Sequence, residues 1–183
     1  MKRGILYLQM KQSDKAFEDF NRLCDIAEND QNPQISLSKA YFYKAKALKK
    51  IDNLDDSMLH FEQVIRLSDD QFLQSSALYE IAKIKIQQKD FYEAYYNLQR
   101  ATHYKLKQRK LMNYKVFTEG VIFLMKRKTK TGIKLLTSLV EKGGMQPNEG
   151  EDYIAPLIYI YRAYGFFVTD EYDKGLKDYI KAN

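Results

Sequence analysis

Apolar residues recur three to four positions apart through most of the chain, which is the spacing that places them on one face of an α-helix. The pattern predicts ten helices arranged in five consecutive pairs. The first helices of the pairs are expected at about Lys2–Met10, Ser38–Lys50, Leu73–Gln88, Lys110–Met125 and Asp152–Phe167. The second helices are expected at about Lys15–Glu28, Asp55–Arg66, Phe91–Tyr104, Thr131–Glu141 and Tyr172–Ala182. An aspartate stands at the start of four second helices, where a capping oxygen is favoured: Asp14, Asp55, Asp90 and Asp170.

Small residues repeat at fixed places within these pairs. Two columns twelve residues apart hold only Gly, Ala or Ser: Gly4, Ala45, Ala82, Gly120 and Ala163, then Ala16, Ser57, Ala94, Gly132 and Gly175. Four residues after each second column stands a large residue: Phe20, Phe61, Leu98, Leu136 and Tyr179. Small side chains let the two helices of a pair approach closely, and the large one fills the gap toward the next pair.

This pattern resembles the tetratricopeptide repeat (TPR) family, which has small residues at its eighth and twentieth places and an aromatic residue at its twenty-fourth. The resemblance implies an all-α fold, a right-handed superhelical solenoid of antiparallel helix hairpins. About five repeats are expected in a single array over residues 1–183, at about 1–32, 38–70, 75–107, 113–142 and 156–183. Counted along the first column, the repeats are 41, 37, 38 and 43 residues apart, longer than the family's usual length of about 34. A Gly- and Pro-containing segment, 143–151, predicts a hinge or a loop.

In that family the first helices line a concave groove that binds partners. Carried over by position, the groove residues are Lys39, Phe42, Lys46, Lys49, Lys50, Tyr79, Lys83, Tyr114, Phe117, Val121 and Leu124. The corresponding places of the fifth repeat hold Leu157, Ile160, Tyr164, Phe167 and Val168. The groove is thus expected to be basic in its first half and apolar in its second, and to bind a peptide with an acidic end and an apolar end. The alternative is that the apolar residues of the fourth and fifth repeats belong to the core.

Positive charge is concentrated in one stretch. The chain has 30 basic and 24 acidic residues, and residues 100–137 hold 11 of the basic ones but a single acid, Glu119. From this stretch we define the basic belt, expected to contact partners: Lys105, Lys107, Arg109, Lys110, Lys126, Arg127, Lys128 and Lys130. Its two halves are expected at opposite ends of the helix at Lys110–Met125, which favours a long acidic surface over a single phosphate. Three interpretations stay open: solvated loops, an acidic protein partner, or nucleic acid without a recognised motif.

The composition argues against catalysis and against a membrane span. With one cysteine, two histidines and no tryptophan, the 183 residues offer no nucleophile–base arrangement and no multi-cysteine metal site. No apolar run approaches the ~18 residues of a membrane span, and the first residues lack the apolar core of a signal peptide. We therefore expect a non-enzymatic, cytoplasmic protein without cofactors or metals.

Three functional hypotheses follow from these observations. The first is a scaffold that binds a protein partner, through a peptide segment or an acidic surface or both, as part of a larger protein or assembly. The second is a structural subunit of a cytoskeletal or axonemal complex whose array ends are buried, because neither end has a separate polar capping helix. The third is an RNA-binding helical repeat, expected to show strongly salt-dependent binding.

Overall fold

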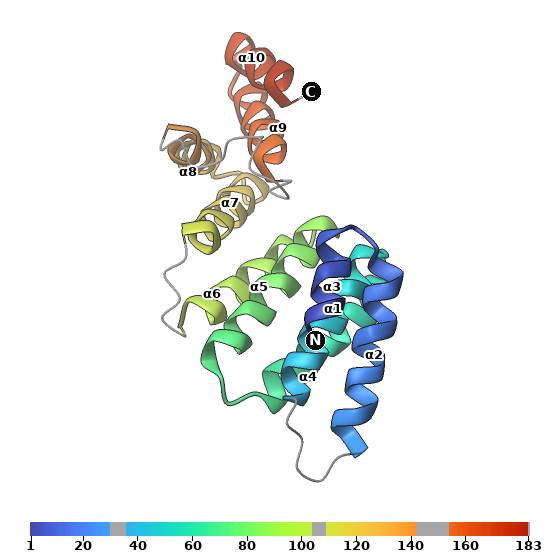
Figure 1. Cartoon of the computed structure of the whole chain (residues 1–183). Coiled ribbons are helices and arrows are strands. Elements are labelled where there is room, and N and C mark those ends of the chain that lie inside the picture. Colours follow the sequence, from blue (N-terminus) through green and yellow to red (C-terminus); the bar gives the residue numbers. More distant parts are fainter. Residues whose placement is uncertain (30–35, 104–108, 142–153, 183) are drawn as a thin grey trace. The chain divides into compact units, whose positions relative to one another are not determined.

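The computed structural model describes residues 1–29, 36–103, 109–141 and 154–182, which form ten α-helices and no β-strand (Figure 1). The helices are α1 (Lys2–Gln9), α2 (Ser13–Asn29), α3 (Leu37–Lys50), α4 (Leu54–Leu67), α5 (Gln71–Gln87), α6 (Phe91–His103), α7 (Arg109–Met125), α8 (Thr129–Glu141), α9 (Ile154–Val168) and α10 (Tyr172–Ala182). Each coincides with a predicted helix to within a few residues, so the all-α prediction is confirmed. The hinge or loop predicted at 143–151 lies outside the described residues.

The chain divides into two compact units. The first comprises residues 1–87 and 100–106, and the second comprises residues 88–99 and 107–183. In the first unit α1 pairs with α2 and α3 with α4, while α2 packs on α3 and α4 on α5. In the second, α7 pairs with α8 and α9 with α10, and α8 packs on α9. Within each unit, successive helices are therefore neighbours, as expected for stacked hairpins.

In the four hairpins that lie within one unit, the small-residue columns lie where the two helices meet. All ten members of the columns are buried. In the α3–α4 hairpin the Ser57 hydroxyl donates a hydrogen bond of 2.8 Å to the Ala45 carbonyl. In the α7–α8 hairpin a Cβ atom added to Gly132 would lie 2.9 Å from the Gly120 carbonyl oxygen. Backbones this close leave no room for a larger side chain at these positions. This confirms that the small residues recur because they let the two helices of a hairpin approach closely.

The large residue that follows each second column fills the space beside these contacts. Phe20 lies against Gly4 and stacks on Tyr43 of the next hairpin, with ring centroids 5.4 Å apart. Four of the five residues in this column are fully buried at 0% exposure: Phe20, Phe61, Leu98 and Leu136. The fifth, Tyr179, is 52% exposed.

The turn inside every described hairpin contains one residue in the left-handed backbone region. These residues have φ between 57° and 64° and none is glycine: Lys11, Asp52, Lys89, Arg127 and Asp170. In four of the turns the next residue donates its backbone N–H to a carbonyl five residues earlier, as from Asn53 to Leu48 at 3.0 Å. These four turns thus close by the same Schellman-type helix ending, although the side chains differ.

Candidate partner-binding surfaces

Helices α3 and α5 pack against each other in the first unit and carry the predicted groove residues of the second and third repeats. The spacing along α3 places its predicted residues on one face of the helix. The surface defined by both helices, called here the α3–α5 face, comprises Lys39, Phe42, Lys46, Lys49, Lys50, Tyr79 and Lys83. Lys39 and Lys50 are exposed, Lys83 is buried, and the others are half-buried.

A glutamate lies among the lysines of this face. Lys49 Nζ donates a hydrogen bond of 2.6 Å to Glu80 Oε2, and Lys83 Nζ lies 3.8 Å from the same oxygen. Lys46 is close enough to stabilise the carboxylate as well. We call Lys46, Lys49, Lys83 and Glu80 the lysine cluster. With three cations and one anion it carries a net positive charge, and Lys39 and Lys50 add to the charge of the face.

Burial and charge oppose each other in the cluster. Burial alone would raise the pKa of Glu80, but the attraction of Lys49, Lys83 and Lys46 outweighs it and holds the pKa below the ordinary value. Burial also lowers the pKa of Lys49, and Lys83 lowers it further, against the raising effect of Glu80. The largely buried carboxylate therefore stays ionised and holds together lysines that would otherwise repel one another.

Aromatic rings lie beneath two of these cations. Lys46 Nζ lies 5.9 Å from the centre of the Phe42 ring, and Lys83 Nζ lies 5.6 Å from that of Tyr79. Such contacts orient the ammonium groups by the attraction of the ring face. The face thus combines directed positive charge with half-buried aromatic surface.

The prediction that residues of the fourth repeat line the groove is wrong. Tyr114, Phe117, Val121 and Leu124 are all buried on α7, so they belong to the core. Tyr161 of α9 packs edge-on against Phe117, with ring centroids 6.0 Å apart, and Leu124 lies where Cβ atoms on Gly132 and Gly165 would stand.

The fifth repeat differs from the fourth. Of its five predicted groove residues, Leu157 is half-buried and the other four are exposed: Ile160, Tyr164, Phe167 and Val168. An apolar surface at this end of the second unit is therefore present.

The basic belt is described only in part. Lys105 and Lys107 lie outside the described residues, as does the side chain of Arg109. The remaining members are exposed: Lys110, Lys126, Arg127, Lys128 and Lys130. Lys110 stands near the start of the 17-residue helix α7 and the others follow its end, so the two groups are about 25 Å apart. Among the described residues, the belt members therefore stand at opposite ends of α7.

Two side chains considered for chemistry have packing roles. His60 stacks on Tyr41 with ring centroids 5.3 Å apart, and burial lowers its pKa below 6.5. Cys24 is buried, which raises the pKa of its thiol to about 11. Within the described part of the chain, no three His, Cys, Asp or Glu side chains are grouped to hold a metal ion. Among the same residues, no helix is both long and apolar enough to cross a membrane.

The sequence reasoning missed a buried ion pair between the helices of the last hairpin. Arg162 of α9 donates two hydrogen bonds to the Asp178 carboxylate of α10, at 2.5 and 2.7 Å, and both side chains are buried. The sequence does indicate that Arg162 needs a partner, because it is the one charged residue within the otherwise uncharged helix Ile154–Val168. Its partner could not be identified from spacing alone.

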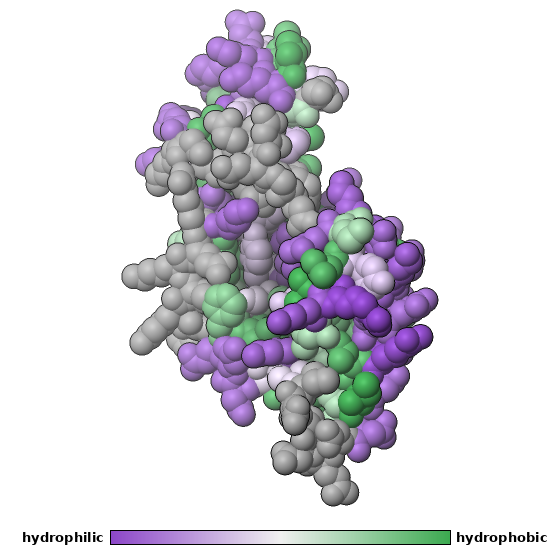
Figure 2. Space-filling view, in the orientation of Figure 1, coloured by the Kyte–Doolittle hydropathy of each residue, from purple (hydrophilic) through white to green (hydrophobic). Residues whose placement is uncertain are grey.

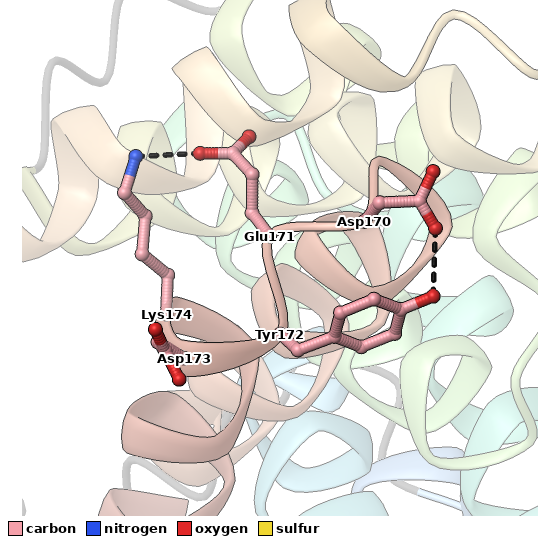
Figure 3. A pocket seen from close by; sticks show the side chains of 5 residues that line it. All are labelled: Asp170, Glu171, Tyr172, Asp173 and Lys174. Carbon is pink, nitrogen blue, oxygen red and sulfur yellow. Dashed lines mark hydrogen bonds and ion pairs between the residues drawn. The ribbon is translucent and has the colours of Figure 1, made fainter.

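A shallow pocket lies at the turn between α9 and α10 (Figure 3). It is lined by five consecutive residues: Asp170, Glu171, Tyr172, Asp173 and Lys174. The Tyr172 hydroxyl donates to Asp170 at 2.7 Å, and Lys174 donates to Glu171 at 2.5 Å. These contacts satisfy the polar groups locally and hold the Tyr172 ring at the start of α10.

Comparison with solved structures supports the TPR-like fold. The chain is 12% identical to BtubC (BKLC) from P. vanneervenii, with a TM-score of 0.65, covering 98% of this chain and 75% of that one. It is 12% identical to a double mutant of MamA RS-1, with a TM-score of 0.65, covering 99% and 89%. It is 12% identical to a putative kinesin light chain with nearly identical TPR-like repeats from Podosopora anserina, with a TM-score of 0.62, covering 99% and 92%. No family model and no curated protein matches the chain. At these identities the likeness establishes the fold, a TPR-like array in which about five repeats account for the helices described.

Proposed function

We propose that this chain is a protein-interaction scaffold that binds an acidic, extended segment of a partner protein along the α3–α5 face. The observation that carries the proposal is the lysine cluster, in which three lysines surround a single glutamate. Helical-repeat folds of this kind present extended surfaces to binding partners. The net positive charge of the face favours a partner segment that carries several carboxylates.

The spacing of the cations on α3 suits an extended peptide. Lys46 and Lys50 are four residues apart on this helix, which is a rise of about 6 Å. Alternate side chains of an extended chain are about 6.6 Å apart. Carboxylates at every second position of such a segment can therefore meet successive lysines, while Phe42, one turn before Lys46, offers apolar contact beside them.

The test is a binding titration with a defined probe. We suggest a fluorescein-labelled ten-residue peptide of alternating Glu and Ser, with the Gln–Ser peptide as its uncharged counterpart, followed by anisotropy. The protein should bind the Glu–Ser peptide and not the Gln–Ser one, and binding should weaken as salt rises from about 50 to about 300 mM.

Paired variants test the location. Replacing Lys46 and Lys50 by Glu should weaken binding of the Glu–Ser peptide about tenfold or more, because both cations contact the carboxylates. The matched control, Lys2→Glu with Lys15→Glu, makes the same change in net charge on exposed residues of α1 and α2 and should alter the affinity less than about twofold. Equal losses in both variants would show attraction to net charge alone and would overturn the proposal.

The same titration separates the RNA alternative. If a labelled single-stranded polyuridine probe binds with a steep salt dependence and loses affinity in the Lys46 and Lys50 variant, while the Glu–Ser peptide does not bind, the face is an RNA site. That outcome would replace the proposal.

The part of the basic belt that follows α7 is a second proposed contact for an acidic partner surface. Lys126 lies 5.5 Å from the centre of the Tyr92 ring, and Lys128 lies 6.0 Å from that of Phe123, so both cations rest on aromatic surface. Reversing Lys126, Arg127, Lys128 and Lys130 to Glu should weaken capture of an acidic partner identified by cross-linking, without lowering the melting temperature. If capture of the partner is unchanged, the belt does not take part in binding.

A place in a cytoskeletal complex stays a prediction. At 12% identity, the likeness to a putative kinesin light chain supports a shared fold and says nothing about a shared partner.

A further inference from the structure

The last hairpin exposes a position that the other hairpins bury. The column that holds Phe20, Phe61, Leu98 and Leu136 is fully buried in four hairpins, and its fifth member, Tyr179, is 52% exposed. One turn earlier, Leu176 is 55% exposed, whereas the equivalent residues of the other hairpins are half-buried. The outer side of α10 therefore exposes positions that the other hairpins bury or half-bury.

The exposed surface extends over both helices of the last hairpin. Its members follow the same helical spacing on each helix and are between 39% and 67% exposed: Ile160, Tyr164, Phe167 and Val168 on α9, and Tyr172, Leu176, Tyr179 and Ile180 on α10. We call these eight residues the end face. Figure 2 shows hydrophobic side chains at the surface in this region, where Figure 1 places α9 and α10. The exposed residues of α9 and those of α10 meet at Phe167. Its ring fills the space where a Cβ atom on Gly175 would stand, and its centroid lies 6.5 Å from that of the Tyr172 ring.

The end face is rigidly supported. Arg162 and Asp178 lock α9 to α10 by their two buried hydrogen bonds. Asp170 holds the Tyr172 hydroxyl at the turn, as Figure 3 shows. A surface that is already ordered binds with little further loss of side-chain freedom.

Area and charge together indicate the occupant. The four aromatic members of the end face can bury about 150–250 Å² each, and the four aliphatic members somewhat less. With about half of each side chain exposed, the end face offers on the order of 700 Å², close to the roughly 800 Å² that one partner contributes to a standard interface. Along the exposed side of α10, Asp173 stands near the beginning of the helix, and Lys177 and Lys181 stand toward its end. An antiparallel copy of α10 would bring Asp173 of each helix near Lys177 of the other, which gives two equivalent ion pairs.

From these observations we propose that the end face binds a second copy of this chain, with the two α10 helices antiparallel across a twofold axis near Leu176. Such a contact is isologous: each copy contributes the same residues, so it closes as a dimer. The proposal concerns the second unit and is independent of the peptide-binding function proposed for the α3–α5 face.

Sedimentation of the full chain over a concentration series tests the dimer. Wild type should pass from monomer to dimer, and Leu176→Asp with Ile180→Asp should weaken the association at least about tenfold. The matched control, Leu59→Asp, changes a leucine of α4 with similar exposure, 52%, and should dimerise as wild type does. A wild type that stays monomeric throughout the series, or that forms open-ended larger species, would overturn the proposal.

Charge exchange tests the antiparallel arrangement. Asp173→Lys and Lys177→Asp should each weaken self-association, because each places like charges opposite one another. An equimolar mixture of the two variants should associate again, since every pair across the axis then has opposite charges. If the mixture associates no better than either variant alone, the antiparallel pairing is wrong.

A cross-link tests the position of the axis. Leu176→Cys should form an intermolecular disulfide on mild oxidation, since the two residues at position 176 would face each other. The native Cys24 is buried and gives a low background, and Leu59→Cys is the control. Equal cross-linking in both variants would place the contact elsewhere.

Discussion

The closest approach of α7 and α8 makes Gly132 the most informative residue at which to test the hairpin packing. An alanine there would place its Cβ 2.9 Å from the Gly120 carbonyl oxygen and 2.8 Å from two carbon atoms of Leu124. Leu124 cannot move aside freely, because its side chain also lies 3.1 Å from the Cβ position of Gly165. The two helices must therefore separate if Gly132 becomes alanine.

Two opposing contributions set the size of the effect. Inserting a methyl group into a packed core costs about 1–3 kcal/mol, whereas replacing Gly by Ala inside a helix gains about 1 kcal/mol. We expect Gly132→Ala to lower the free energy of unfolding by about 1 kcal/mol. For a chain of this size that is a fall in melting temperature of about 2–4 °C.

Gly120→Ala is the matched control on the facing helix. Its Cβ would meet the Leu136 side chain at 3.0 Å, and the Gly132 carbonyl oxygen at an ordinary 3.5 Å. The smaller clash and the gain in helix propensity should nearly cancel, so the melting temperature should change by less than about 2 °C. Melting followed by circular dichroism at the helical band measures both variants. If Gly132→Ala is as stable as wild type or more stable, the close backbone contact does not limit the packing and the reasoning fails.

Three further predictions concern buried polar groups. Arg162→Leu should lower the free energy of unfolding by about 3–5 kcal/mol, because Asp178 is left buried without its partner, and adding Asp178→Leu should restore most of the loss in urea titrations. Burial, with Lys44 nearby, lowers the pKa of His60 below 6.5, so the unfolded chain binds the proton more readily and stability should decline as the pH falls below about 6.5. His60→Phe should make that decline in melting temperature shallower, and an unchanged profile would contradict the assignment. Cys24, whose pKa is raised to about 11, should react with Ellman's reagent at pH 8 roughly a hundredfold more slowly in the folded protein than in denaturant.

The hairpin packing could be read from the sequence because it depends on local spacing. The small residues at the facing positions of the two helices repeat at a fixed spacing in the sequence, as Gly120 and Gly132 do twelve positions apart. The bounds of the helices followed from the same register. Both depend on residues within one hairpin, where sequence distance and spatial distance agree.

The candidate surfaces were harder to predict because they depend on which neighbour covers which face. Phe117 and Val121 occupy groove positions by spacing, but Tyr161 of α9 reaches Phe117 from a helix more than forty residues later. A signal was present: Val121–Met125 is an unbroken apolar run, which places apolar side chains on more than one face of α7. The Lys49–Glu80 contact likewise joins residues 31 positions apart, a pairing that no local rule specifies.

The recurring left-handed turn makes each hairpin a self-contained module. Because Lys11, Asp52 and Arg127 adopt the same backbone geometry with different side chains, the closure of a hairpin does not depend on which residue occupies that place. Grafting the turn of one hairpin into another should therefore preserve the length and register of both helices. Charge, glycine or a short recognition sequence could be introduced at these five corners while the packing between helices stays intact.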